Sequence, residues 1–355
     1  MIQDLFRSDL SDFKHYEAGK IDYEIRLNAN ENFSNFDEDV RKEIGRAIEN
    51  FVFNRYPDPR AFEVCGLYAQ YSNVLSENIM AGNGSDECIQ IIANTFLNTG
   101  DKVGVQSPDF SMYGLYTKVA GGIPIEFPLN SNLKLDVEGF IYRVNEEKVK
   151  IVFLSNPNNP TGGIISRENI IKIIEECNCI VVIDEAYFEF YGKTVVDLIY
   201  KYENLIVLRT CSKFGLAAVR LGFLITGEVL MRELEKVKPP YNVNAISQCI
   251  GSVIMKDSEI INKTVECILI EKKYLLQELS TISSIKIYES EANFILIEPE
   301  NAKKMKERLL EKSINVRGFD SGRLQNCLRI TVGSREENFY LLTNISQEMK
   351  EINVL

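Results

Sequence analysis

Five short apolar runs alternate with amphipathic stretches along the middle of the chain, and this alternation constrains the fold more than any other feature. Each run is rich in Val, Ile or Leu and is closely followed by polar or glycine-bearing residues, which is typical of a strand buried on both faces. Strands that alternate with helices predict an α/β sheet. The predicted strands are Lys102–Gln106, Val149–Leu154, Ile180–Ile183, Leu205–Leu208 and Leu221–Thr226, and helices are predicted at Asp86–Leu97 and Arg167–Glu176.

The C-terminal part has a different pattern, which predicts a smaller α+β unit joined to the rest by a long helix at Asp257–Leu279. The first forty residues lack strong periodicity and are expected to wrap the surface or a partner. We therefore expect an N-terminal arm with part of the small domain over residues 1–39, a large domain over 40–280 and a small domain over 281–355. The small domain should contain strands Ile285–Tyr288, Asn293–Ile297 and Cys327–Val332 and helices Asn301–Ser313 and Glu336–Ile352.

Composition excludes several classes of partner. The net charge of the 355-residue chain is −11, which argues against nucleic acid or an anionic membrane, because both require a basic surface. Eight cysteines are scattered, the closest pair (Cys177 and Cys179) fits no common zinc spacing, and His15 is the single histidine, so no metal site is predicted. Free cysteines and the lack of a signal peptide or membrane-spanning run lead us to expect a cytoplasmic protein.

Unusual polar residues cluster at one helix start and three strand ends, the places where open α/β sheets bind ligands. The segment Gly82–Asp86 precedes a helix whose N-terminus would suit an anion; the alternative, which the motif favours when taken alone, is a capped helix after a tight turn. The segment Ser155–Gly162 follows a strand and has the composition of a turn. It nevertheless holds more Asn, Pro and Gly residues than a connection requires.

Two further motifs place titratable groups at strand ends. Asp184 begins the motif Asp184–Tyr187 at the tip of a buried strand, where a carboxylate is costly unless it is paired; a helix-capping acid is the alternative. The motif Thr210–Lys213, followed by Arg220, would suit a phosphate or a reactive amine, and a solvated lysine is the alternative.

In their order and spacing, the four motifs together resemble the fold type I enzymes that use pyridoxal 5'-phosphate (PLP), in particular the aminotransferase subgroup that includes histidinol-phosphate aminotransferase. The Asn-Pro-Asn-Asn-Pro-Thr-Gly and Asp-Glu-Ala-Tyr motifs are specific at this separation. The resemblance covers essentially the whole chain and implies a large domain with a mainly parallel mixed sheet covered by helices, plus a smaller α+β domain. Further matching segments are His15–Lys20, Leu27–Asn32, Arg55–Asp58 and Cys327–Gly333.

The resemblance implies roles for the residues around the cofactor ring. Lys213 is expected to form a Schiff base with PLP and later to move the proton between the substrate's α-carbon and the cofactor, which needs an amine that is not permanently protonated. Asp184 is expected to pair with the pyridinium nitrogen and so keep the ring able to accept electrons. Tyr187 and Asn159 are expected to bond the ring's 3'-oxygen, and Phe110 to stack on the ring.

The resemblance also implies a cradle for the cofactor phosphate. Its expected members are the backbone of Gly84, Ser85 and Asp86, the side chains of Thr210, Ser212 and Arg220, and Tyr56 from a second subunit. The family's arginine usually follows the lysine by eight residues, whereas Arg220 follows Lys213 by seven, so this connection is one residue shorter than in the family.

On the substrate side, Arg329 matches the arginine that closes on the substrate's anionic end, a task suited to guanidinium. Arg317 and Tyr16 stand where the subgroup has a second arginine and an N-terminal tyrosine, and Asn159 also belongs to this side. A surface position for Arg317 and packing of the arm for Tyr16 are the alternatives. The implied reaction moves an amino group between L-histidinol phosphate and 2-oxoglutarate, through the pyridoxal and pyridoxamine forms of the cofactor, in histidine biosynthesis.

Three other functions stay open. An aromatic amino acid aminotransferase would share every cofactor residue, and a threonine-phosphate decarboxylase uses the same scaffold, although the lack of proline in Phe214–Val219 argues mildly against it. A PLP-binding regulator would need a DNA-binding domain, for which there is no room before Asn28, and a basic surface. Because Tyr56 and Tyr16 match residues that complete the neighbour's site, we expect an obligate homodimer.

Overall fold

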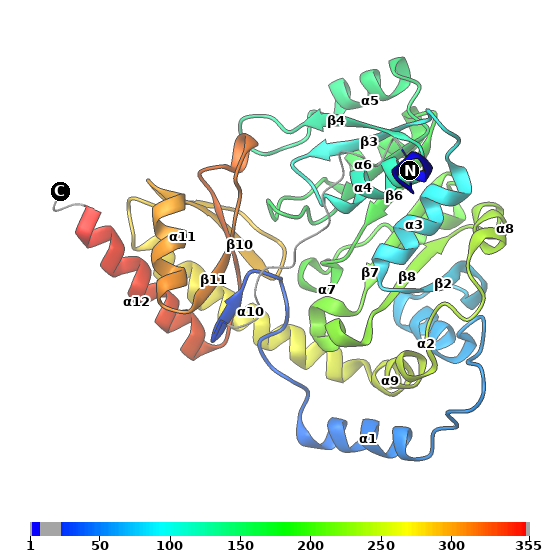
Figure 1. Ribbon diagram of the computed structural model, residues 1–355, viewed down its shortest axis with the longest axis horizontal. Helices are drawn as coiled ribbons and strands as arrows, with labels where there is room; N and C mark the ends of the chain where they lie inside the picture. Colours follow the sequence, from blue (N-terminus) through cyan, green and yellow to red (C-terminus); the bar gives the residue numbers. More distant parts are fainter. Residues whose placement is uncertain (1, 8–22, 353–355) are drawn as a thin grey trace.

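The computed structural model describes residues 2–7 and 23–352, and within them the chain forms two sheets (Figure 1). The larger sheet has seven strands in the order β2-β8-β7-β6-β5-β3-β4. Strands β3 to β7 are parallel, and β8 runs antiparallel to β2 and β7, so the predicted mainly parallel mixed sheet is confirmed. Its strands are β2 (Ile79–Asn83), β3 (Lys102–Ser107), β4 (Ile123–Pro128), β5 (Ile151–Ser155), β6 (Ile180–Asp184), β7 (Leu205–Thr210) and β8 (Leu221–Thr226).

Alternate side chains of the large sheet enter two different cores, because neighbouring residues of a strand point to opposite faces. In β5, Val152 and Leu154 belong to one core, and Ile151 and Phe153 to the other. Helices cover both faces and complete these cores, as expected for strands that are apolar throughout. The first core receives α2 (Phe62–Ser72), α5 (Val137–Glu146), α6 (Arg167–Glu176) and α9 (Ala245–Met255), and the second α3 (Ser85–Phe96), α4 (Met112–Val119) and α8 (Glu228–Val237).

The smaller sheet has the order β1-β11-β12-β10-β9 and packs one face against three helices. Its first strand comes from the N-terminal segment and pairs in parallel with β11, with Ile25 opposite Ile314. Its elements are β1 (Ile25–Leu27), β9 (Lys286–Tyr288), β10 (Phe294–Glu298), β11 (Ile314–Gly318) and β12 (Leu328–Thr331), with helices α10 (Ser258–Ser280), α11 (Ala302–Glu311) and α12 (Arg335–Ile352).

Helix α10 spans both parts of the molecule (Figure 1). Val265 in its first half packs in a core of the large sheet, and Leu275 in its second half packs in the core of the small sheet. We therefore propose that the boundary between the two domains lies within this helix, between Ile268 and Leu275, somewhat before the expected residue 280. Helix α1 (Glu38–Glu49), capped by the Asp37 side chain, lies before the large sheet in the sequence.

All predicted strands and helices are present, with bounds that differ by no more than about three residues, and α6 has the predicted ends. Four strands were not predicted. Strand β4 contains Pro124 and Pro128 and is confined to an edge, where proline is tolerated. Strands β1, β2 and β11 are short or interrupted by small and polar residues, and each depends on a neighbouring strand for its pairing.

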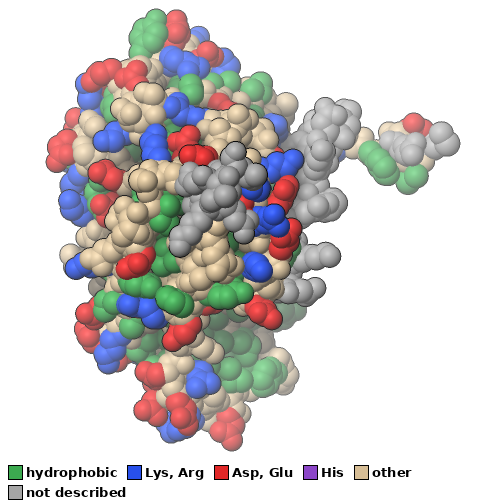
Figure 2. Space-filling model, turned by 90° about the vertical axis from the view of Figure 1, so that its left-hand side faces the viewer, with side chains coloured by type: hydrophobic (Ala, Val, Ile, Leu, Met, Phe, Trp, Pro, Cys, Tyr) green, Lys and Arg blue, Asp and Glu red, His purple; other side chains and the backbone are tan. Residues whose placement is uncertain are grey.

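On the face drawn in Figure 2, acidic and basic side chains are interspersed and no broad basic area is visible. Among the residues that the structure describes, no helix is both long enough and apolar enough to cross a membrane.

Candidate active site

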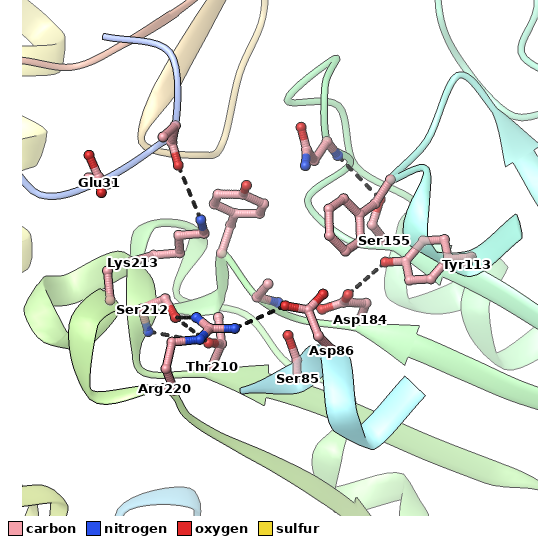
Figure 3. A pocket seen from close by; sticks show the side chains of 16 residues that line it. Glu31, Ser85, Asp86, Tyr113, Ser155, Asp184, Thr210, Ser212, Lys213 and Arg220 are labelled. Atoms are coloured by element: carbon pink, nitrogen blue, oxygen red, sulfur yellow. Dashed lines mark hydrogen bonds and ion pairs between the residues drawn. The ribbon is translucent and has the colours of Figure 1, made fainter. Parts of the chain in front are cut away.

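A cavity of about 280 Å³ opens at the carboxyl ends of β5, β6 and β7, the position at which open α/β sheets bind ligands (Figure 3). Its walls come from the start of α3, the loop after β3, three strand ends, the segment after β7 and the segment that follows β1. Most of the predicted site residues line it: Ser85, Asp86, Phe110, Asn159, Asp184, Tyr187, Thr210, Ser212, Lys213 and Arg220. Among the described residues, no group of three or more His, Cys, Asp or Glu could hold a metal ion.

Lys213 reaches the cavity from a single wide, π-helical turn, Ser212–Leu216, that follows β7. Its Nζ donates to the carbonyl oxygen of Ala29 at 3.4 Å and lies 5.8 Å from the centre of the Tyr187 ring. Burial, helped by the positive charge of Arg329, lowers the pKa of Lys213 to about 8. A large fraction of its amine is therefore neutral near pH 8, which nucleophilic and proton-transfer roles require.

Asp184 ends β6 and is only 4% exposed. One carboxylate oxygen accepts the Tyr113 hydroxyl at 2.6 Å, and the other accepts the backbone N–H of Ala186 at 2.9 Å. Burial raises the pKa of Asp184 to about 6, while these two hydrogen bonds oppose the rise. Asp184 is therefore mainly ionised at neutral pH, and it faces the cavity opposite Lys213 (Figure 3).

Tyr187 and Asn159 face the cavity from two loops and are each bonded to the other part of the molecule. The Tyr187 hydroxyl accepts the side-chain N–H of Asn30 at 2.8 Å, and its ring packs edge-on against Phe294 of β10. The Asn159 oxygen accepts from Arg329 of β12, whose other terminal nitrogen donates to the carbonyl of Asn28 at 2.6 Å. Arg329 is thus held beside the cavity by acceptors from two separate segments.

The start of α3 and Arg220 form one end of the cavity. Arg220 donates to Asp86 at 3.0 Å and to Ser212 Oγ at 3.4 Å, and Ser212 Oγ also accepts from Thr210 at 3.0 Å. Gly84 has φ +79°, and a Cβ there would lie 2.6 Å from Arg220 Nη2. The chain between Lys213 and Arg220 is kinked at Gly215, so the guanidinium enters the cavity although this connection is one residue shorter than expected.

Three predicted residues lie elsewhere or cannot be placed. Tyr56 is 83% exposed and stacks on Tyr241, with ring centres 4.8 Å apart, away from the cavity of its own chain. Arg317 is exposed on β11 and is the register partner of Arg329 on β12. Tyr16 lies outside the described residues.

Several cavity residues were not predicted. Tyr113 follows Phe110 by one helical turn and bonds Asp184, and Ser155 bonds the carboxylate of Asp109 and the backbone of Asn159. Tyr113 resembles an ordinary core residue of a helix, and only its spacing from Phe110 could have suggested a role. Ser155, in contrast, stands at the head of a predicted motif and could have been included.

The chain matches known proteins over almost its whole length. Residues 23–345 match the family described as aminotransferase class I and II. The histidinol-phosphate aminotransferase of Clostridium novyi (strain NT) is 51% identical over 97% of this chain and 97% of its own length. The enzyme of the same name from Clostridium kluyveri (strain NBRC 12016) is 48% identical over 99% of this chain and 100% of its own.

Solved structures share the fold. The crystal structure of the histidinol-phosphate aminotransferase from Clostridium acetobutylicum superposes with a TM-score of 0.84, covering 92% of this chain and 99% of that one at 25% identity. The enzyme of that name from Sinorhizobium meliloti, solved in complex with pyridoxal-5'-phosphate, gives a TM-score of 0.86 over 93% of this chain and 92% of that one. At 21% identity, the second likeness concerns the fold alone.

Proposed function

The chain belongs to the class I and II aminotransferases, within the histidinol-phosphate aminotransferase group, and from this membership we infer that it is a PLP-dependent enzyme that transfers an amino group between L-histidinol phosphate and 2-oxoglutarate. The observation that carries the proposal is that one cavity is lined by both Lys213 and Asp184, together with the start of α3 and Arg220. An amine, a carboxylate and an anion cradle are the groups that PLP requires.

The residues present fit the cofactor in size and charge. Gly84 leaves the Arg220 guanidinium close to the backbone at the start of α3, where a Cβ would collide with it. Backbone N–H groups at a helix start, together with an arginine and two hydroxyls, suit a phosphate dianion. We propose that Ser85, Asp86, Thr210, Ser212 and Arg220 hold the phosphate, and that Phe110 stacks on the ring.

Bound PLP supplies an electron sink for the pair left behind when a proton leaves the substrate's α-carbon. Asp184, ionised through its bonds to Tyr113 and Ala186, holds a proton on the ring nitrogen. Lys213, neutral at mildly alkaline pH, takes the α-proton and returns it to the cofactor side. Tyr187 and Asn159, which line the cavity, would hold the cofactor ring through its 3'-oxygen.

The two arginines of the small sheet support the choice of a substrate with an anionic end. Arg329 and Arg317 occupy directly opposite positions on antiparallel strands, so their side chains leave the same face of the sheet. Arg329 is already bonded to Asn159 at the cavity, which places a guanidinium beside the proposed ring site. A phosphate would satisfy two such cations, and we propose that Arg317, Arg329 and Tyr16 bind the phosphate of histidinol phosphate.

The test is a half-reaction followed by absorbance. The purified protein is loaded with PLP, and L-histidinol phosphate is added without a keto acid. We expect the visible band of the bound cofactor to disappear and to return on addition of 2-oxoglutarate, and Lys213→Ala should abolish both changes. A protein that forms no band contradicts the cofactor assignment.

Other outcomes would identify a different substrate. A band that persists with histidinol phosphate but is lost with phenylalanine would indicate an aromatic amino acid aminotransferase. Release of carbon dioxide from threonine phosphate would indicate a decarboxylase. We also propose that the enzyme is a homodimer and, because its cysteines are free, that it works in the cytoplasm.

A further inference from the structure

Asn30 is a buried residue next to the cavity that makes four hydrogen bonds and that the proposed chemistry leaves without a role. It lies in the segment after β1, is 1% exposed and has a left-handed backbone (φ +55°), a conformation that asparagine adopts more readily than most residues. Its backbone N–H donates to Thr331 Oγ1 at 3.0 Å, and its carbonyl accepts from Asn293 at 3.1 Å. Thr331 belongs to β12 of the small sheet, and Asn293 directly precedes β10.

The side chain of Asn30 has only one orientation that satisfies its neighbours. Its Oδ1 accepts the hydroxyl of Thr331 at 3.1 Å, and its Nδ2 donates to the hydroxyl oxygen of Tyr187 at 2.8 Å. Turning the amide over would set its N–H₂ against Thr331 Oγ1, which already accepts from the Asn30 backbone, and would break this reciprocal pair. The amide is therefore fixed as a donor toward Tyr187.

A phenol oxygen that accepts one hydrogen bond still has its own proton to donate. Asn30 cannot receive that proton, because its oxygen is turned to Thr331. Burial raises the pKa of Tyr187 to about 12, so the proton is present throughout the neutral range. Since Tyr187 lines the cavity, the proton is available to a group bound there.

We propose that Asn30 is a positioning residue that fixes the Tyr187 hydroxyl as a one-way donor into the cavity, toward the 3'-oxygen of the cofactor. The inference rests on the proposed function and deepens it. It also makes the orientation of the Tyr187 hydroxyl depend on β12, because Thr331 lies two residues after Arg329 on that strand and on the same face. The residue that binds the substrate's anion and the residue that orients Tyr187 are therefore held by one strand.

The test is Asn30→Asp, which keeps the shape of the side chain and replaces the donor by an acceptor. Tyr187 then donates to the introduced carboxylate and no longer to the cofactor, whose negatively charged oxygen loses a hydrogen bond. We expect the pH midpoint of the absorbance change of bound PLP, measured without substrate, to rise by about one. Asn293→Asp is the matched control: it makes the same chemical change in the same network but does not touch Tyr187, and should move the midpoint by less than about 0.3.

A double variant separates the hydroxyl from the new charge. In the Tyr187→Phe background, Asn30→Asp retains any direct effect of its charge but has no hydroxyl to redirect, so its shift should be much smaller than in the wild-type background. An equal shift in both backgrounds, no shift, or the same shift from Asn293→Asp would overturn the inference. Wild-type protein that forms no absorbance band would instead overturn the proposed function, and the inference with it. Thermal unfolding of each variant identifies loss of the fold.

Discussion

Two opposing effects act on the charge of the Lys213 amine. Burial disfavours the charge, and the carboxylates of Asp86 and Glu31 favour it. Burial is the larger effect and brings its pKa from 10.5 to about 8. Only the neutral amine attacks an aldehyde. We therefore expect the rate of PLP capture by cofactor-free protein to fall about tenfold for each pH unit below 8 and to level off above it. Stopped-flow absorbance across about pH 6–10 measures this, and a midpoint near 10, the ordinary value for lysine, would contradict the assigned environment.

Gly84 is needed where the backbone passes under Arg220. Alanine there meets both a left-handed φ and a guanidinium nitrogen at 2.6 Å, so Arg220 must move away from the cradle. Gly84→Ala should weaken PLP binding roughly ten- to hundredfold, the value of one hydrogen bond to a charged group. Gly45→Ala is the control, because nothing lies within 4 Å of that position in α1, and it should leave affinity unchanged. Equal affinity of both variants would remove Gly84 from the cradle.

At the level of the strands, neighbouring residues at the carboxyl ends of β6 and β7 point to opposite faces of the sheet and make different contacts. Asp184 and Thr210 face the cavity, whereas Glu185 and Arg209 form an ion pair at 2.8 Å on the opposite face, with both side chains 1% exposed. The pair joins the ends of the two strands directly behind the cavity. Arg209 also lies over the Phe188 ring at 3.5 Å.

Removing one partner of this pair should destabilise the fold strongly, because a buried charge is left unpaired. Arg209→Met is expected to lower the free energy of unfolding by about 3–5 kcal/mol. Arg167→Met provides the comparison: its ion pair with Asp197 is largely exposed and should be worth less than about 1 kcal/mol. Urea unfolding of both variants measures the two losses in the free energy of unfolding. Similar losses would show that burial of the Glu185–Arg209 pair is unimportant.

Five of the seven strands of the large sheet, β3 and β5 to β8, could be predicted because they are apolar on both faces, and that pattern requires no knowledge of their neighbours. Strand β11 could not, since only Ile314 and Val316 face the core and its remaining side chains are polar or absent. The same holds for the site: residues in local motifs could be predicted, and residues that depend on distant partners could not. Lys213 and Asp184 belong to local motifs, but Tyr113 and Asn30 act through hydrogen bonds to residues 71 and 157 positions away, which no local pattern reports.

On the scale of the whole molecule, the segment from the end of α1 to the start of α2 carries four large exposed apolar side chains, Val52, Phe53, Tyr56 and Phe62. Exposed apolar side chains that lie together are typical of protein interfaces. Together with the expected contribution of Tyr56 to a second site, they support the proposed homodimer.

Mixing two defective variants tests this sharing of sites. Lys213→Ala and Tyr56→Ala protein, unfolded together and refolded at equal concentration, should form heterodimers with one intact site in two. Half of the dimers are then mixed, so about one quarter of the wild-type activity should return. Refolding each variant alone is the control. Activity no higher than the average of the two separate variants would contradict a site shared between subunits.

The pairing of β1 with β11 has a consequence for the order in which the protein is made. Ile25 and Leu27 leave the ribosome early, but the strand on which they pack is synthesised roughly 290 residues later, on the order of 15–60 s at usual elongation rates. During that interval the apolar face of β1 lacks its partner strand, and all seven strands of the large sheet are synthesised. Ala29 and Glu31, which line the cavity, follow β1 directly, so this wall of the cavity takes its place only after β11 has been synthesised.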